Sequence, residues 1–129
     1  MLYRPQSYHL LIVDRPRAFP EILSKFRASD VAVITARNAL EAEAKLFLYG
    51  DQTIDALWIN IDLPESDLER LLTAIHTDQR LKKVQVFCIG DKTSSSQAQV
   101  CRTFGVKNII FRQQHDVGDI AHYIMGLLE

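Results

Sequence analysis

This sequence of 129 residues has few glycines and no large excess of charge of one sign. It has 5 glycines, and no Gly-x-Gly-x-x-Gly or Gly-x-x-x-x-Gly-Lys loop follows any apolar run, which disfavours a dinucleotide or nucleoside triphosphate enzyme. A formal net charge of -1 provides no general electrostatic field to attract nucleic acid or acidic lipid. Direct binding to nucleic acid or to a membrane is therefore not expected.

Long apolar runs and patterned cysteines are missing as well. No run approaches the roughly 20 residues that a helix needs to cross a bilayer, and the first residues lack the apolar centre of a signal peptide. These absences predict a cytoplasmic protein. Cys88 and Cys101 have no Cys-x-x-Cys spacing for zinc or redox chemistry, so both are expected to be small buried hydrophobic residues.

The composition that is present is that of one globular domain. Apolar residues make up 47% and charged residues 24% of the sequence, close to globular averages. A chain of 129 residues is long enough for one core and too short for two domains of ordinary size. We therefore expect a single domain over residues 1–129, in which residues 1–7, with Pro5, form an extended lead-in.

Five apolar runs alternate with five stretches of helical periodicity. The runs expected to be strands are residues 9–13, 31–36, 56–59, 84–89 and 106–111. Such alternation with short connections predicts a parallel sheet with right-handed crossovers and helices on both faces. The predicted architecture is α/β and flavodoxin-like, a doubly wound (βα)5 sheet with strand order 2-1-3-4-5.

The helices are expected to begin at capping residues and to bury one apolar stripe each. Asn38 is expected to cap the second helix, Ser66 or Asp67 the third, and Asp116 or one of its neighbours the last. The inward stripe predicted for the second helix, which should end at Gly50, is Leu40, Ala44, Phe47 and Leu48. In the last helix it is Ile120, Tyr123, Ile124 and Leu127. The fourth helix, over residues 93–104, has few apolar anchors and a serine run at residues 94–96, so it is expected to be the least stable.

Polar residues stand at the carboxyl ends of two predicted strands, where open α/β sheets place their ligands and chemistry. Asp14 follows the first strand, and Asn60 ends the run Ala56-Leu57-Trp58-Ile59, which is apolar enough for a central strand. The residue at the end of the central strand is thus an amide and not an acid.

Taken together, these segments resemble the receiver domain of bacterial two-component response regulators over residues 8–128. Residues 9–15 resemble the family's first strand and its acid pair, and residues 33–36 its second strand. Residues 55–64 resemble the strand and loop that carry the phosphorylated Asp, and residues 105–112 the last strand. The resemblance implies a phosphoacceptor Asp four residues before Pro64, a Mg²⁺-binding acid pair, a Ser or Thr ending strand four, and Lys-Pro ending strand five.

The sequence departs from that pattern at almost every chemical position, and of the acids only Asp14 remains. The replacements are Arg15 for the second acid, Asn60 for the phosphoacceptor, Gly90 for the hydroxyl residue, Arg112-Gln113 for Lys-Pro, and Ile109 for the aromatic switch residue. An amide is a far poorer nucleophile than a carboxylate, and exchanging an acid for Arg removes a Mg²⁺ ligand. We therefore predict no phosphorylation, no metal, no cofactor and no enzymatic activity, with Arg15 or Arg112 neutralising Asp14.

Two other groups of residues suggest metal sites but are better explained as surface. Asp62 and Glu65 lie in an acidic loop that is expected to face water. His115, Asp119 and His122 have helical spacing, but no second cluster of ligands is visible in the sequence.

The resemblance implies a pseudo-receiver that signals through contact with a protein partner or an output domain, alone or as the amino-terminal part of a longer regulator. In the family, partners and a second copy bind the face made by helix four, strand five and helix five, which here would present Gln97, Lys107, Asp119 and Tyr123. The alternative is a sensor of a small molecule or second messenger at the degenerate pocket or a dimer seam, with Arg15 and Arg112 as anion ligands. A third hypothesis is a phosphoacceptor that uses another residue, such as Asp62.

Overall fold

The computed structural model describes residues 8–27, 29–48, 54–91 and 96–128. The expected lead-in over residues 1–7, the helix end expected at Gly50, and residues 93–95 of the predicted fourth helix lie outside the described residues. The side chain of Leu48 is also outside them.

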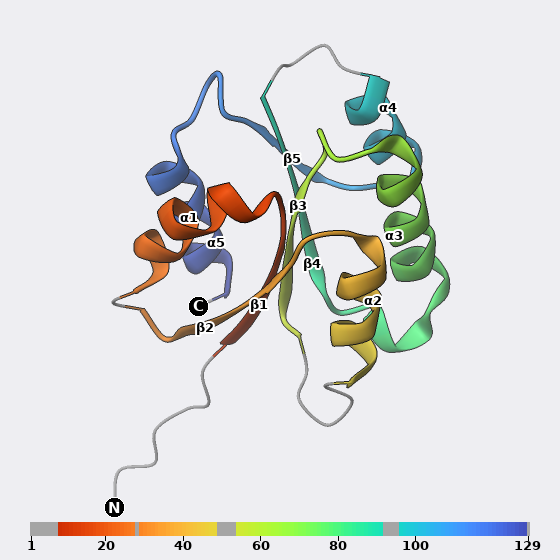
Figure 1. Cartoon of the computed structure of the whole chain (residues 1–129), viewed down its shortest axis with the longest axis horizontal. Helices are drawn as coiled ribbons and strands as arrows, with labels where there is room; N and C mark the ends of the chain where they lie inside the picture. The colour runs from red at the N-terminus through yellow and green to blue at the C-terminus, as the bar shows by residue number, and fades with distance from the viewer. Residues whose placement is uncertain (1–7, 28, 49–53, 92–95, 129) are drawn as a thin grey trace, which may run out of the picture.

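A single sheet of five parallel strands forms the centre of the domain (Figure 1). The strands are β1 (Tyr8–Val13), β2 (Val31–Ala36), β3 (Ala56–Asn60), β4 (Gln85–Gly90) and β5 (Asn108–Phe111). Their order is β2-β1-β3-β4-β5, which confirms the predicted flavodoxin-like topology. Every residue of β3 is buried, as expected of a central strand between two helical layers.

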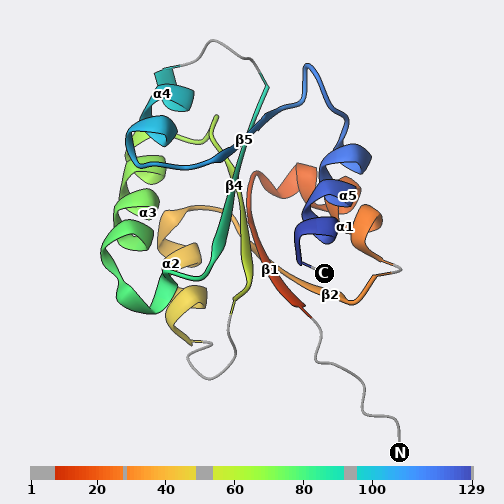
Figure 2. The same cartoon turned by 180° about the vertical axis from the view of Figure 1, so that it is seen from behind.

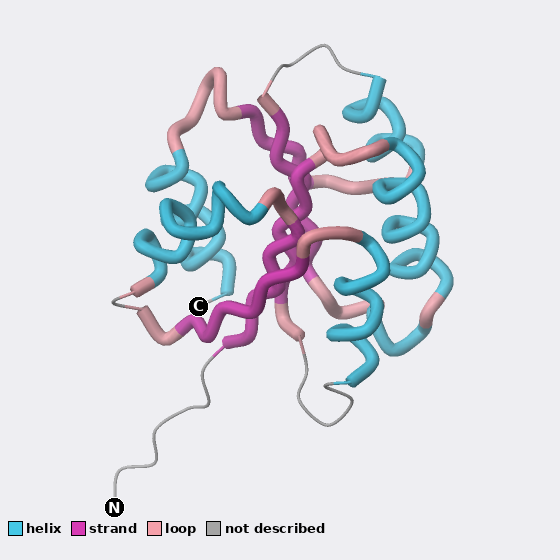
Figure 3. Tube along the Cα trace, viewed as in Figure 1, coloured by secondary structure: helices cyan, strands magenta, loops and turns pink. Residues whose placement is uncertain are grey.

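Helices cover both faces of the sheet, and Figure 3 shows the strands between two helical layers. The helices are α1 (Phe19–Phe26), α2 (Ala39–Leu48), α3 (Glu65–Thr77), α4 (Ser96–Thr103) and α5 (Val117–Leu128), with short 3-10 helices at Pro16–Ala18 and Gln79–Leu81. Helices α1 and α5 lie on one face, and α2, α3 and α4 on the other (Figures 1 and 2). The buried apolar residues accordingly form two clusters, one on each side of the sheet.

The apolar stripe predicted for α2 is wrong. Leu40 is 63% exposed and Phe47 is 38% exposed, and Ala44 is exposed as well. The helix instead buries Ala39, Ala42 and Leu46. Phe47 instead lies on the outward side, where the centre of its ring is 4.8 Å from the guanidinium carbon of Arg80.

Helix α5 also differs from the prediction in part. It buries the predicted Ile120 and Ile124, together with Val117 and Ala121. Tyr123 and Leu127, however, are 48% and 43% exposed. The buried stripe is thus built on positions 117, 120, 121 and 124, and Tyr123 belongs to the surface beside it.

Two of the three predicted helix caps are confirmed. Asn38 Oδ1 accepts a hydrogen bond from the amide of Glu41 at 2.9 Å, and Asp116 Oδ1 accepts one from the amide of Asp119 at 2.8 Å. The prediction of Ser66 or Asp67 as a cap is wrong, because α3 begins at Glu65, directly after Pro64. Proline has no amide hydrogen to leave unsatisfied, which suits it to a helix start.

Cys88 in β4 and Cys101 in α4 are fully buried, as predicted. Contact with the Cys101 thiol, together with burial, raises the pKa of the Cys88 thiol. In the part of the chain that the structure describes, no helix has the length and hydropathy needed to cross a membrane.

Candidate functional site

The carboxyl ends of four strands bring the predicted site residues to one edge of the sheet. Asp14 follows β1, Asn60 ends β3, Gly90 ends β4, and Arg112 follows β5. The parallel register places Asn60 beside Ile89 and Gly90 beside Phe111, so these strand ends are level with one another. The structure thus brings Asp14, Asn60, Gly90 and Arg112 to one edge of the sheet, and their role as a degenerate phosphoacceptor pocket stays a prediction.

Asp14 is the buried centre of this edge. Only 1% of its surface is exposed, and each carboxylate oxygen accepts two hydrogen bonds. Oδ1 accepts from the Arg15 amide at 2.7 Å and from Asn60 Nδ2 at 2.8 Å. Oδ2 accepts from Arg112 Nη2 at 3.0 Å and from Trp58 Nε1 at 3.3 Å. A carboxylate has about four lone-pair directions, and here all of them meet protein donors.

Arg112 is the cation that neutralises Asp14. The sequence left open whether Arg15 or Arg112 does so, and the ion pair is formed by Arg112 at 3.0 Å, with 27% of its side chain exposed. The Arg112 amide also donates to the Gly90 carbonyl at 2.8 Å, which ties its backbone to the end of β4. Its Nε is buried and has no hydrogen-bond partner among the described residues. The guanidinium is therefore held by Asp14 through one of its donor groups.

Arg15 lies at the same edge but has a different role. It is exposed, and its Nη2 donates to the Asp62 carbonyl at 3.1 Å. The side chain thus bridges the end of β1 to the loop after β3. Among the hydrogen bonds of the described residues, Arg15 contacts the Asp14 carboxylate through its backbone amide and not through its side chain.

The Asn60 amide is oriented by a hydrogen bond at each end. Its Nδ2 donates to Asp14 at 2.8 Å, and its Oδ1 accepts from the Asp62 amide at 2.8 Å. A carboxylate at this position accepts at both oxygens and donates at neither when ionised. Asn60 is thus the residue type that satisfies both neighbours, since Asp14 needs a donor and the Asp62 amide needs an acceptor.

The sequence suggested that Asp62 simply faces water, and the structure shows otherwise. Its Oδ2 accepts a hydrogen bond from the amide of Asp91 at 3.0 Å, which connects the loop after β3 to the end of β4. Its side chain therefore has a structural partner, whereas Glu65 is exposed at the start of α3.

The space next to Gly90 is filled by the side chain of Ile61. A Cβ atom built on Gly90 would lie 2.6 Å from Ile61 Cδ1 and 2.9 Å from Ile61 Cγ1. Ile61 is fully buried, so its side chain has little freedom to withdraw. A side chain at position 90 therefore requires Ile61 to shift, and a hydroxyl side chain does not fit there without that rearrangement.

Trp58 is the member of the site that sequence reasoning missed. It is fully buried, as its place in a central strand predicts, and its indole Nε1 also donates to Asp14. The signal that identifies it is strand periodicity: positions 58 and 60 are two apart in β3 and so point to the same face of the sheet.

The residues predicted for an interaction face separate into two places. Lys107, Asp119 and Tyr123 line a groove of about 320 Å³ between β5 and α5, and the Tyr123 hydroxyl donates to Asn108 at 3.1 Å. Gln97, on α4, lies near the loop after β3, with its Nε2 3.5 Å from the Leu63 carbonyl. Ile109, at the predicted switch position, is half-buried against the core on the α3 and α4 side.

The residues at this edge do not match the needs of Mg²⁺, which the resemblance would imply. Magnesium is bound through carboxylate and water oxygens in octahedral geometry, and the one buried carboxylate has its acceptor positions filled by Arg112, Asn60, Trp58 and the Arg15 amide. Over the described ranges, no group of three or more His, Cys, Asp and Glu residues is placed to hold a metal ion.

Several solved structures of response regulators share this fold. The phosphorylated cyanobacterial phytochrome response regulator RcpA is 20% identical, with a TM-score of 0.75 over 94% of this chain and 91% of that chain. A LuxR-family DNA-binding response regulator from Staphylococcus aureus is 11% identical, with a TM-score of 0.76 over 95% and 99% of the two chains. A chain from the complex of the CheA3 P1 domain with CheY6 from R. sphaeroides is 21% identical, with a TM-score of 0.72 over 96% and 98%.

These likenesses define the fold as that of response-regulator receiver domains. No protein-family model matches the sequence, and no curated protein sequence matches it either.

Proposed function

We propose that this domain is a pseudo-receiver, a signalling module that acts through contact with a protein partner and does not depend on phosphorylation. The observation that carries the proposal is the closed shell of donors around Asp14, in which the Arg112 guanidinium supplies the positive charge beside the carboxylate. Under this proposal the domain has no catalytic turnover of its own, and it works in the cytoplasm with a partner or an output domain.

Phosphoryl transfer needs a bound divalent cation and a nucleophile, and the residues at this edge are poorly suited to provide either. A divalent cation would have to displace the Arg112 guanidinium and the Asn60 amide from a carboxylate that is 1% exposed. The incoming phosphoryl group also requires a nucleophile, and the Asn60 amide is a poor one. Asp62 is the other carboxylate near Asn60. It accepts a hydrogen bond from the Asp91 amide and so helps to hold the loop after β3 in place.

The alternative of an anion sensor at this same edge has less support. Arg112 is engaged by Asp14, and the Arg15 side chain by the Asp62 carbonyl. An anion that drew both arginines away from these contacts would leave Asp14 buried without its cation, which costs several kcal/mol.

The direct test is incubation with a small phosphodonor, acetyl phosphate, in the presence of Mg²⁺, followed by intact-mass measurement. We expect no gain of a phosphoryl mass, because the site lacks both the nucleophile and the cation position. A stoichiometric gain of one phosphoryl group, mapped to any residue near Asn60, would overturn the proposal.

The Asn60→Asp variant is the informative partner in that experiment. It restores a carboxylate at the family's phosphoacceptor position, but it also removes the donor to Asp14 and sets two carboxylates against each other. We expect little or no phosphorylation and a less stable domain. Robust phosphorylation of this single variant would show that Arg112 and Arg15 do not block the cation.

Amide hydrogen exchange tests the role of α4 in partner binding. This helix has 8 residues, and Ala98 and Cys101 are its buried residues, so we expect it to open more easily than β1 and β3. Its exchange should be unaffected by Mg²⁺ and acetyl phosphate, since nothing at the site responds to them. Exchange in α4 as slow as in β1 and β3 would contradict its use as an adaptable docking surface.

A further inference from the structure

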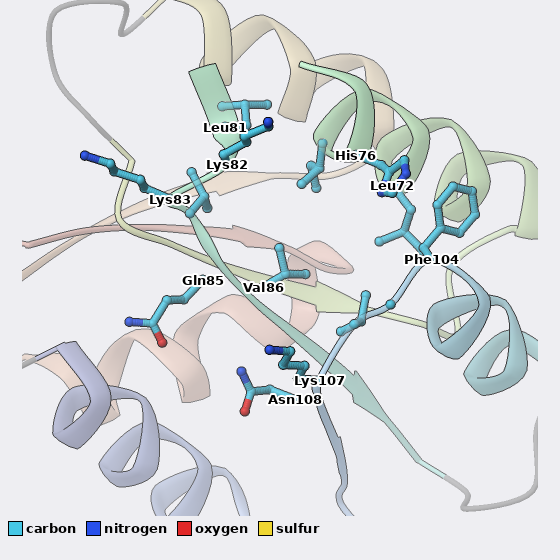
Figure 4. A pocket seen from close by; sticks show the side chains of 14 residues that line it. Leu72, His76, Leu81, Lys82, Lys83, Gln85, Val86, Phe104, Lys107 and Asn108 are labelled. Atoms are coloured by element: carbon cyan, nitrogen blue, oxygen red, sulfur yellow. The ribbon is translucent and has the colours of Figure 1, made fainter. Parts of the chain in front are cut away.

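A groove of about 590 Å³ lies at the edge of the sheet opposite Asp14, at the amino-terminal ends of β4 and β5 (Figure 4). Its walls come from the end of α3, from the turn that leads into β4, and from the segment between α4 and β5. The volume falls within the roughly 300–1,000 Å³ that is typical of small-molecule sites.

The floor of the groove is apolar and only half covered. Its residues Ile75, Val84, Val86, Phe104 and Val106 pack against the core but remain partly exposed. Apolar surface left in water is unfavourable by about 25 cal/mol per Å², and an apolar ligand lying on this floor would remove it from water.

The charges around the groove are of one sign. Lys82, Lys83 and Lys107 are exposed in its lining, and no acidic residue is among the 14 lining residues. None of the three forms a salt bridge within the described ranges. The nearby Asp78 carboxylate is engaged by Arg80 at 2.8 Å, so it does not neutralise the lysines.

Gln85, Lys107 and Asn108 lie together on one side of the groove (Figure 4). Leu72 and Phe104 lie across from them with His76, and Lys82 and Lys83 lie on a third side beside Leu81. Asn108 Oδ1 accepts the Tyr123 hydroxyl, which leaves its amide nitrogen as the donor. The side with Lys107 and Asn108 thus offers hydrogen-bond donors and one positive charge next to the apolar floor.

We infer that this groove binds a small amphipathic anion, a molecule with an aliphatic or aromatic body and one carboxylate or sulfonate group. The body lies on the floor formed by Val86, Phe104 and Val106, and the anionic group is near Lys107 and Asn108. The inference goes beyond the proposed signalling role and does not rest on it, because the groove is far from the Asp14 edge and its test involves no phosphorylation.

The test uses a matched pair of fluorescent probes. 8-Anilinonaphthalene-1-sulfonate carries one negative charge, and N-phenyl-1-naphthylamine has nearly the same rings without it. We expect saturable binding of the anionic probe at one site, displacement by octanoate, and clearly weaker binding of the neutral probe. Absence of saturable binding, or equal affinity for both probes, would overturn the inference.

Substitution of the exposed lysines tests the charge contribution without disturbing the core. The triple change Lys82→Gln, Lys83→Gln, Lys107→Gln should lower the affinity for the anionic probe about tenfold and leave the affinity for the neutral probe unchanged. Lys25→Gln, on the exposed side of α1, is the matched control and should have no effect. Equal affinity of the triple variant and the control for the anionic probe would contradict the inference.

Amide chemical shifts locate the probe, because Lys107 and Asn108 also line the smaller groove beside α5. We expect perturbations at residues 72–76, 82–86 and 104–106. Perturbations centred on Ile120 and Tyr123 would place the probe in the other groove and would overturn the assignment.

Discussion

Replacing Arg112 by Met is expected to lower the free energy of unfolding by about 3 kcal/mol, because it leaves a buried carboxylate without its cation. Asp14 is 1% exposed, and Arg112 is its only salt-bridge partner among the described residues. The three neutral donors that remain do not balance the charge. Urea denaturation at neutral pH gives the difference directly, provided the slope of the transition is unchanged.

Two further variants separate the ion pair from a general effect of removing arginine. Arg15→Met removes an exposed side chain from the same edge, where it contacts only a carbonyl among the described residues, and should change stability by less than about 0.5 kcal/mol. In an Asp14→Asn background, removal of Arg112 should cost much less than in the native protein, because no charge is left unpaired. Equal costs in the two backgrounds would mean that the pair contributes no specific interaction.

Gly90→Ser should destabilise the domain by about 1–3 kcal/mol through overpacking. Its Cβ would meet Ile61 Cδ1 at 2.6 Å, and the fully buried Ile61 can withdraw only by displacing its own neighbours. Gly126→Ser is the matched control, because a Cβ built there meets nothing within 4 Å, and it should not be destabilising. Thermal or urea unfolding of the two variants measures the contrast.

Removing the obstructing side chain should relieve the strain at position 90. Ile61→Ala alone leaves a cavity and costs about 2–5 kcal/mol. Combined with Gly90→Ser, it should cost less than the sum of the two single variants, because the serine side chain occupies part of the cavity. Additive costs would show that Ile61 and position 90 do not interact.

The fold could be predicted from the sequence because its signals are local and repeated. Continuous apolar runs mark buried parallel strands, and the residues at their carboxyl ends must meet at one edge whatever the details of packing. The helix faces were harder to predict. In α2 the sequence offers Leu40 and Phe47 as well as Ala39 and Ala42, and the structure buries the two alanines.

The contacts within the site could be predicted only in part. Residue identities at positions 14, 15, 60, 90 and 112 led to the prediction of a site without phosphoacceptor chemistry, but they did not show which arginine would reach Asp14. That choice depends on backbone placement: Arg112 is tied to Gly90 by its amide, while Arg15 turns towards the Asp62 carbonyl. The filling of the space at Gly90 by Ile61 depends on side-chain packing between neighbouring strands and has no signal in the sequence.

The most direct test of the closed site uses Trp58, the one tryptophan of the chain, whose indole nitrogen donates to Asp14 Oδ2. The fluorescence of Trp58 and its indole N–H resonance should report any cation that reaches the carboxylate. During titration with Mg²⁺, with and without beryllofluoride, we predict no saturable change in either signal. A saturable change in both signals that is abolished by Asp14→Asn would show that the site still binds a cation, and would contradict the account of a pseudo-receiver.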